Sequence, residues 1–341
     1  MREEARQSSQ VETSKEKPMP VLLEQEFLEY SKALIDERLN SVQGSGPNSV
    51  SQRILTLACR HLCISEHAKR VRPLLCLYYH WMLSQEIEPK FTNVGVAAEF
   101  IHAASLLHDD IIDEAKERRG KPSVNHAFGN ATAVLAGDFL LTEAFLLLLP
   151  FDRALSEKAI YVVREMTKAA ILEMDARGKI DVTLETWRTI ALGKTGSLFS
   201  WCGYAVGHFL NSHALAEQLW HLGNHIGVIF QLADDLKDFD GDHHLKDVCR
   251  DIRNLESNLP VILAIHDDAR VKQRFAQAIE TGSIDENQAI DLCDLVMQSG
   301  AIAKASELLD QEMAVLLNKL AHFDESPGKR CLERLIADLI L

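Results

Sequence analysis

Two clusters of aspartate residues, far apart in the sequence, carry the side chains with the clearest chemical potential. The first lies in LLHDDIID, and the second lies 125 residues downstream in LADDLKD. Both have the spacing Asp-Asp-x-x-Asp in an apolar run of helical period, which places the carboxylates on one side of a helix. If other helices bring the clusters face to face, their like charges repel, and Mg²⁺ ions that also bind phosphate oxygens relieve that repulsion. The six residues, Asp109, Asp110, Asp113, Asp234, Asp235 and Asp238, therefore predict a metal-bridged diphosphate site.

Basic residues gather near the first cluster and in one earlier segment. Arg118 and Arg119 follow the first cluster directly, and the planar guanidinium group suits bidentate binding of phosphate. Lys69, Arg70 and Arg72 precede a helix whose first turn contains proline. Taken alone, that earlier group fits a solvated, basic helix start better than a binding site, and surface charge is the simple alternative for the two arginines.

Two further patterns place polar side chains within apolar helices. His102 shares a helical stripe with Ser105 and Asp109, but a lone histidine on an apolar helix is equally well explained as a core residue. Lys194 and Thr195 stand in GKTG, where small neighbours are expected to let a ligand approach. The upstream glycine of a nucleotide-binding loop is missing, so this tripeptide does not indicate nucleotide hydrolysis.

The composition indicates one large helical domain. The chain has 341 residues, 47% of them hydrophobic, and only 9 prolines and 17 glycines, which argues against sandwich, barrel and solenoid folds. A net charge of −14 argues against nucleic acid or an anionic membrane as a partner. Seven cysteines without a Cys-x-x-Cys pair are typical of reduced thiols in a cytoplasmic protein. Thr142 and Glu143 interrupt the longest apolar run, so we expect no transmembrane segment.

Apolar periodicity divides the chain into a tail and a helical domain. We expect the polar residues 1–20 to be a disordered tail without a signal peptide, and residues 21–341 to form the domain. The polar segment 239–258 is placed to close over the mouth of the bundle, and Pro260 restarts regular structure. Long bundle helices are expected at 93–113, 131–149, 154–177, 184–210 and 214–238.

From about the second helix onward, the chain resembles the trans-isoprenyl diphosphate synthases, the polyprenyl synthetase family. The resemblance rests on both aspartate motifs, the RRG after the first, FGNATAVLAGDF, the Lys-Thr pair, and Phe230 and Gln231 before the second motif, all in family order. It implies an all-α bundle around a deep cavity, usually in a homodimer, that uses Mg²⁺ to couple isopentenyl diphosphate to an allylic prenyl diphosphate. The segment RRGKPSVNHAFGNATAVLAGDF is most similar to octaprenyl-type, long-chain synthases.

The resemblance also implies a role for each candidate site residue. The implied Mg²⁺ ligands are Asp109, Asp113 and Asp234, and the residues implied to support the two clusters are Asp110, Asp235 and Asp238. The residues implied to hold the allylic diphosphate are Arg118, Lys194, Thr195, Gln231 and Lys246. Those implied to bind isopentenyl diphosphate are Lys69, Arg72, His102 and Arg119.

Two segments depart from the family pattern. His67 and Ala68 stand where relatives usually have paired glycines, and Glu256 stands where relatives have a lysine that faces the allylic diphosphate. An unshielded carboxylate there would repel the diphosphate by ~1–3 kcal/mol at an effective dielectric near 20. These departures leave open a weakly active or regulatory subunit of a heteromeric synthase. A class I terpene cyclase, which also ionises a prenyl diphosphate with Mg²⁺, is the third hypothesis.

Small side chains one turn before Asp109 predict a long product. Ala104 and Ser105 stand where short-chain relatives often have an aromatic ring, which would fill the space for a growing hydrocarbon. Lowering the cavity floor by four helical residues lengthens the cavity by about 6 Å, roughly one five-carbon unit. Trp201 and Tyr204, on another helix, are the alternative floor.

Overall fold

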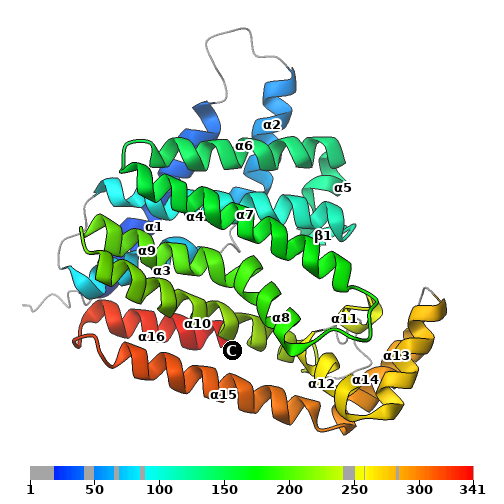
Figure 1. The fold of residues 1–341 in the computed structure, drawn as a ribbon. Helices are drawn as coiled ribbons and strands as arrows, with labels where there is room; N and C mark the ends of the chain where they lie inside the picture. Colours follow the sequence, from blue (N-terminus) through cyan, green and yellow to red (C-terminus); the bar gives the residue numbers. More distant parts are fainter. Residues whose placement is uncertain are drawn as a thin grey trace, which may run out of the picture.

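The computed structural model describes residues 19–41, 50–64, 69–84, 89–240, 250–256, 258–281 and 284–340. Nearly all of these residues are helical, so the predicted all-α fold is confirmed (Figure 1). Residues 1–18 of the expected tail lie outside the described range, and the first helix already begins at Met19.

The long helices agree closely with the predicted ranges. The first half contains α1 (Met19–Ser41), α2 (Val50–Cys63), α3 (Val71–Leu83), a 3-10 turn (Pro89–Phe91), α4 (Thr92–Ile112), α5 (Val124–Phe128), α6 (Asn130–Leu148) and α7 (Arg153–Ala176). The second half contains α8 (Leu184–Ala191), a π-helical turn (Leu192–Gly196), α9 (Ser197–Phe209), α10 (His213–Lys237), α11 (Arg250–Arg253), α12 (Leu259–Asp267), α13 (Ala269–Thr281), α14 (Glu286–Gln298), α15 (Ala301–Leu320) and α16 (Pro327–Ile340).

Helix starts are marked by polar side chains that accept hydrogen bonds from the first turn. Asp152 accepts from the backbone N–H of Ala154 at the start of α7, and Ser212 accepts from that of Leu215 at the start of α10. Asn258 does the same for α12, whose first turn contains Pro260, as the sequence predicts. Such caps satisfy backbone donors that have no partner within the helix.

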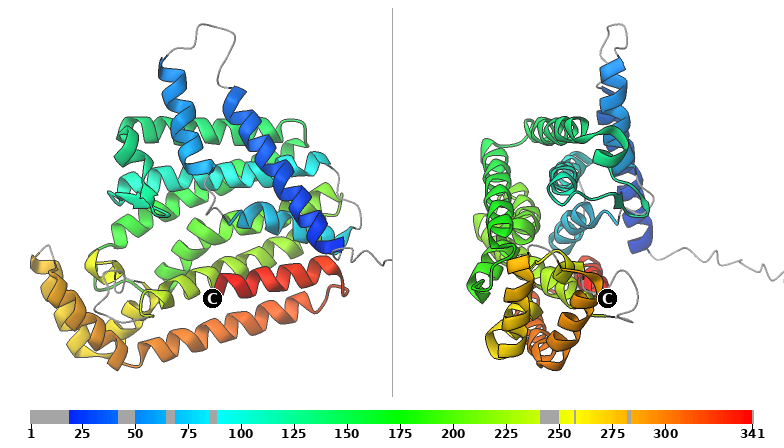
Figure 2. Two further views of the ribbon diagram at one scale, coloured as in Figure 1. Left: turned by 180° about the vertical axis from the view of Figure 1, so that it is seen from behind. Right: turned by 90° about the vertical axis from the view of Figure 1, so that its right-hand side faces the viewer.

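Helix α4 lies at the centre of the bundle. It packs against α6, α3, α1 and α9, and both views of Figure 2 show it surrounded by other helices. Thirteen of its 21 residues are buried, more than one amphipathic face would bury. The first aspartate motif is therefore carried by a helix that neighbours hold on several sides.

Helices α9 and α10 are in backbone contact because glycine stands at their crossing points. A Cβ atom on Gly223 would lie 2.5 Å from the Cα of Ser200, and one on Gly227 would lie 2.3 Å from the Cα of Gly196. Likewise, a Cβ on Gly193 would lie 2.6 Å from the Cβ of Ala169 in α7. The two glycines of GKTG therefore serve close helix packing, while Lys194 and Thr195 between them line the cavity described below.

A short hairpin that the sequence reading missed follows the first aspartate motif. Strand β1 (Glu117–Arg118) pairs antiparallel with β2 (Lys121–Pro122), with Arg118 opposite Lys121. Arg119 and Gly120 form the two-residue turn with φ angles of 53° and 72°. Both turn residues are left-handed, as such tight hairpins require.

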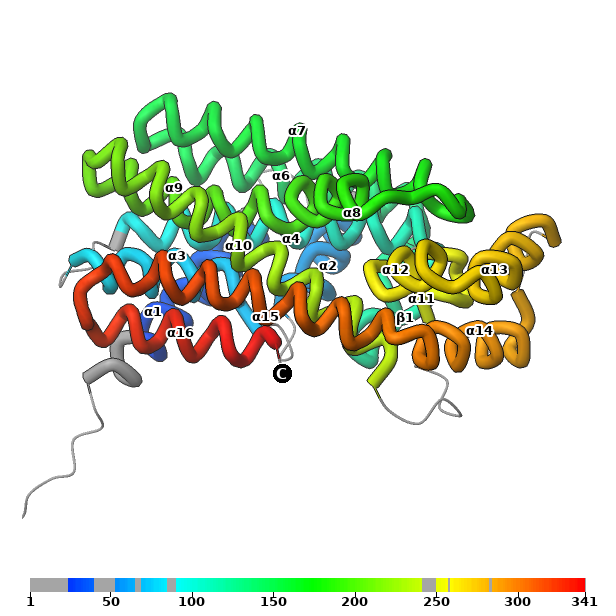
Figure 3. Tube along the Cα trace, turned by 60° about the horizontal axis from the view of Figure 1, so that its bottom comes forward, coloured from blue at the N-terminus to red at the C-terminus, as the bar shows by residue number. Residues whose placement is uncertain are grey.

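The C-terminal helices divide into two groups. Helices α11 to α14 gather at one end of the molecule (Figure 3) and enclose a separate small core that includes Phe239, Ile252 and Phe275. Helices α15 and α16 return along the bundle, where α15 packs on α10 and α16 packs on α3. The chain thus closes over both α3 and α10, which carry candidate site residues.

Helix α6 has one core face and one exposed apolar face. Eight of its residues are buried, whereas Val134, Leu135 and Leu146 are exposed. By length and composition it is the one described helix apolar enough to cross a membrane, with a mean hydropathy of 1.7. Thr142 and Glu143, which interrupt the apolar run in the sequence, both lie within this helix, and Glu143 is buried. A core helix of a soluble protein passes the same test.

Candidate active site

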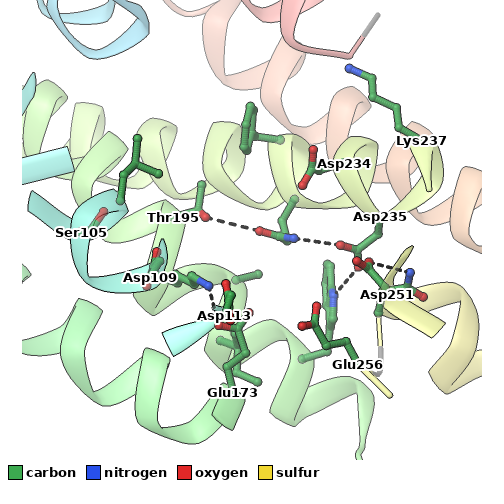
Figure 4. Close-up of a pocket in the computed structure, with 18 of the residues that line it drawn as sticks. Ser105, Asp109, Asp113, Glu173, Thr195, Asp234, Asp235, Lys237, Asp251 and Glu256 are labelled. Carbon is green, nitrogen blue, oxygen red and sulfur yellow. Dashed lines mark hydrogen bonds and ion pairs between the residues drawn. The ribbon is translucent and has the colours of Figure 1, made fainter. Parts of the chain in front are cut away.

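A cavity of about 630 Å³ lies between α3, α4, the C-terminal end of α7, and α10. Seven carboxylates and eight Lys or Arg side chains are among the described residues that line it. The two aspartate motifs approach it from opposite sides, α4 carrying one and α10 the other (Figure 4). The predicted meeting of the two motifs around one cavity is therefore present.

Three of the aspartates that line the cavity are the residues of the motifs for which metal binding is implied. Asp109 and Asp113 line it from α4, and Asp234 lines it from α10. Burial raises the pKa of Asp109, while the nearby Lys194 lowers it. Burial and Asp251 raise the pKa of Asp234. These are the same three residues for which the family resemblance implies metal ligation.

Two other aspartates of the motifs make structural contacts instead. Asp110 is 1% exposed and accepts a hydrogen bond of 2.7 Å from Nε of Arg118, so it fixes the arginine beside the cavity. Asp238 accepts hydrogen bonds from the backbone N–H groups of Arg250 at 2.9 Å and Asp251 at 3.3 Å. It thereby caps the start of α11, in the segment expected to close over the bundle.

Asp235 joins three elements through its carboxylate. It accepts hydrogen bonds of 2.8 Å from Nε1 of Trp187, from the backbone N–H of Leu259, and from Nε2 of Gln231. Burial raises the pKa of Asp235 to about 7, and the three donors act in the opposite direction. The side chain lines the base of the cavity but serves mainly to hold α10 against α8 and α12.

Lys194 and Thr195 reach the cavity from the π-helical turn. Lys194 Nζ forms an ion pair with Glu173 of α7, and Thr195 Oγ1 donates to Oε1 of Gln231 at 3.4 Å. Although burial lowers the pKa of Lys194, Glu173 and Asp109 raise it above its ordinary value. Glu173, which lies in the predicted helix 154–177, was not among the site residues expected from the sequence.

The other side of the cavity is cationic. Lys69, Arg72, His102 and Arg119 all line it. Arg72 lies 5.1 Å from the ring centroid of Phe199, and its buried Nε has no hydrogen-bond partner among the described residues. Burial, with Arg72 and Arg119, holds the pKa of His102 well below its ordinary value. The cations on this side of the cavity suit an anionic ligand.

Arg70, unlike Lys69 and Arg72, is not among the described residues that line the cavity. It adopts a left-handed conformation at the start of α3, with a φ of 53°, and its Nη1 lies 2.6 Å from Oε1 of Glu99. Both side chains are 6% exposed, so this is a buried ion pair. The solvated helix start considered for this segment is therefore wrong for Arg70.

Glu256 is not an unshielded carboxylate. Nη2 of Arg177 lies 3.0 Å from Oε1 of Glu256 and 2.8 Å from Oδ1 of Asp113. Burial and Asp251 raise the pKa of Glu256 to about 7, and Arg177 lowers it. The expectation of a bare repulsive charge is therefore wrong. Arg177, the last residue of the predicted helix 154–177, was the missed cation.

The floor of the cavity differs in part from the predicted one. Ser105 lines the cavity, whereas Ala104 is 1% exposed and packs in the core instead. Trp201 is fully buried, and neither it nor Tyr204 is among the described lining residues. Phe199 and Phe230 line the apolar part, with ring centroids 5.9 Å apart.

The donor set fits Mg²⁺ bound together with a diphosphate. Within the described ranges, no group of three or more His, Cys, Asp or Glu side chains is close enough to hold a metal ion unaided. Mg²⁺ is usually held by one or two carboxylates plus substrate phosphates, and Asp109, Asp113 and Asp234 supply such carboxylates from two sides. Three residues of the sequence-based site, His67, Ala68 and Lys246, lie outside the described residues.

Comparisons of the sequence and of the fold with known proteins identify the same family. The polyprenyl synthetase family model matches residues 52–296. The chain is 32% identical to the nonaprenyl diphosphate synthase of Mycobacterium tuberculosis, over 79% of this chain and 81% of that protein. It superposes on a decaprenyl diphosphate synthase from Rhodobacter capsulatus with a TM-score of 0.84 at 26% identity, covering 94% of this chain and 98% of the other. A polyprenyl synthase from Caulobacter crescentus, solved with calcium and isoprenyl diphosphate, gives a TM-score of 0.83 at 26% identity, covering 94% and 96%.

The contrasting contacts of two adjacent aspartates generate a stability prediction. Asp235→Ala should lower the free energy of unfolding by about 2–5 kcal/mol, because buried donors on Trp187 and Leu259 lose their acceptor. The matched control is Asp234→Ala, whose carboxylate is open to the cavity; it should leave stability within about 0.5 kcal/mol. Urea denaturation followed by circular dichroism measures both. Equal stability of the two variants would contradict the assigned clamp.

Proposed function

Because this chain belongs to the polyprenyl synthetase family, we propose that it couples isopentenyl diphosphate to an allylic prenyl diphosphate in a Mg²⁺-dependent reaction. One observation carries the proposal. A single cavity has a carboxylate-rich side, with Asp109, Asp113 and Asp234, and a cationic side around Arg72. The first suits a metal-bound diphosphate and the second suits a diphosphate without metal, so two different substrates have a place.

Different groups of cavity residues have different roles in the proposed reaction. When bound, Mg²⁺ supplies positive charge that stabilises the departing diphosphate. Lys194, Thr195 and Arg118 donate hydrogen bonds to the allylic diphosphate, and they stabilise the charge that develops as the carbon–oxygen bond breaks. Lys69, Arg72, His102 and Arg119 hold isopentenyl diphosphate, whose double bond attacks the allylic cation. The released diphosphate takes the proton that is then lost.

Apolar side chains in the cavity protect the cation from water. Leu106, Phe199 and Phe230 line the part of the cavity next to Ser105. Excluding water prevents hydrolysis of a reactive intermediate. The same apolar region is where the growing hydrocarbon extends.

The proposed activity is tested with purified protein, Mg²⁺, labelled isopentenyl diphosphate and a set of allylic primers. Label in prenyl products supports coupling. Diphosphate release and a cyclic product without incorporation of label would indicate a terpene cyclase. No turnover from the chain alone would indicate the non-catalytic subunit. The cationic side of the cavity favours coupling, because a cyclase needs no second diphosphate site.

Metal dependence follows from the facing carboxylates. Asp109→Ala and Asp234→Ala should each lower turnover by several orders of magnitude without loss of helix content, and chelation with EDTA should abolish activity reversibly. Asp310→Ala, which removes an exposed carboxylate on α15, is the control and should be fully active. Near-normal turnover in either cavity variant would refute the metal site.

Product length is predicted from the small side chain at Ser105. We propose a product longer than geranylgeranyl diphosphate, supported by the open position beside Ser105 and by long-chain relatives. Ser105→Phe should shift products to short chains while preserving the first condensation, since the ring fills the cavity. Ser105→Ala fills nothing and should leave chain lengths unchanged. Reversed-phase analysis of the dephosphorylated products measures both, and an unchanged distribution in Ser105→Phe would place the floor elsewhere.

We propose that the protein is a cytoplasmic homodimer in which the apolar face of α6 is covered by a second copy. Val134, Leu135 and Leu146 form this exposed face. Leu135→Glu should convert the dimer to a monomer, measured by size-exclusion chromatography with light scattering, because it places a charge in an apolar interface. Leu317→Glu, at a half-exposed site on α15 across the molecule (Figure 1), is the control. A wild type found as a monomer, or only in detergent-extracted membranes, would contradict the proposal.

A further inference from the structure

The end of α7 and the segment after α11 are joined at the cavity by more than one interaction. Arg177 is the extended C-cap residue of α7, with φ −61° and ψ 130°. The N–H of Gly178 donates to the carbonyl oxygen of Leu255 at 2.9 Å. Leu255 has a left-handed φ of 54°, and Glu256 follows it at the Arg177 ion pair. The backbone of both segments thus brings Arg177 and Glu256 together.

The guanidinium of Arg177 faces the cavity with unused donors. Its Nη2 makes both ion pairs, at 2.8 Å to Asp113 and 3.0 Å to Glu256. Its buried Nε has no hydrogen-bond partner among the described residues, although the side chain is 29% exposed. An arginine fork binds phosphate oxygens through several N–H groups at once. Arg177 can therefore accept an anion while one bond holds it in place.

Charge balance shows why this side of the cavity needs that cation. Asp109, Asp113, Glu173 and Glu256 all line it, and Lys194 is already paired with Glu173. If Asp113 binds metal, Glu256 remains as the partner that keeps the guanidinium beside the cavity. The glutamate then acts through the arginine and not against the substrate.

We propose that Arg177 is a substrate-binding residue for the allylic diphosphate, and that Glu256 positions it there. This inference rests on the proposed function. It assigns to Arg177, from α7, the positive charge that relatives provide with a lysine at the position of Glu256.

The first test measures binding of Mg²⁺ with inorganic diphosphate by calorimetry, together with steady-state kinetics. Arg177→Gln should weaken diphosphate binding about 10- to 100-fold and raise the KM of the allylic substrate, leaving that of isopentenyl diphosphate unchanged. Arg177→Lys should recover part of this loss. Lys179→Gln, which removes a cation paired with Asp175 outside the cavity, is the matched control and should bind as wild type.

The second test removes the charge of the positioning residue. Glu256→Ala leaves Arg177 without this partner and should weaken diphosphate binding about tenfold, whereas simple repulsion of the substrate by Glu256 predicts tighter binding. Glu256→Gln should show a smaller loss with the same sign. The double variant Arg177→Gln, Glu256→Lys returns one cation and should bind better than Arg177→Gln alone. Thermal denaturation of each variant separates these effects from unfolding.

The outcomes separate this inference from the proposed function. If the wild type incorporates isopentenyl diphosphate but Arg177→Gln binds diphosphate normally, the inference is refuted and the function stands. Tighter binding by Glu256→Ala refutes the positioning role in the same way. If the wild type neither incorporates isopentenyl diphosphate nor binds diphosphate with Mg²⁺, the proposed function and this inference both fail.

Discussion

The constraint on which this structure depends is that many charges of both signs must be kept in a cavity inside an apolar helical bundle. A charge removed from water is costly unless it is paired or hydrogen-bonded. The motifs meet this requirement residue by residue. Asp110 is paired with Arg118, Asp235 accepts three hydrogen bonds, and Asp113 is paired with Arg177. Among the described residues, Asp109 and Asp234 have no hydrogen bond or ion pair of this kind, and both line the cavity, where they can bind a cation.

The helices that carry these charges are held by small residues and by burial. Helix α4 is packed on several sides, and α10 meets α9 and the π-helical turn with backbone in contact at Gly223 and Gly227. Close packing limits how far either helix can move relative to the other. The distance between the two aspartate motifs is therefore set by interior packing, and a substitution at one of these glycines would act on the site by shifting the helices that carry it.

Two glutamates that line the cavity form ion pairs with cations. Glu173 pairs with Lys194, and Glu256 pairs with Arg177, so each acidic residue is matched with a cation from another segment. At Glu256, where the chain departs from the family pattern, the carboxylate is thus balanced by the guanidinium of Arg177. This pairing is visible only in the folded chain, because the two residues are far apart in the sequence.

The helical fold, the ranges of the long helices and the pairing of the two aspartate motifs could all be predicted from the sequence. These follow from local periodicity and from residue spacing, which a single segment contains in full. Most residues with implied roles indeed line the cavity, including Arg72, His102 and Lys194. Periodicity could not show which side of a motif faces the cavity, so only the family resemblance distinguished Asp110 and Asp238 from Asp109 and Asp234.

Which charges meet depends on the tertiary fold. Glu173 and Arg177 lie near the end of the predicted bundle helix 154–177, and nothing local indicates that this end reaches the cavity. Ala104 and Ser105 are adjacent in sequence, yet one packs in the core and the other lines the cavity. Successive residues on a helix point about 100° apart, so the neighbours that surround the helix determine which of them is accessible to a ligand.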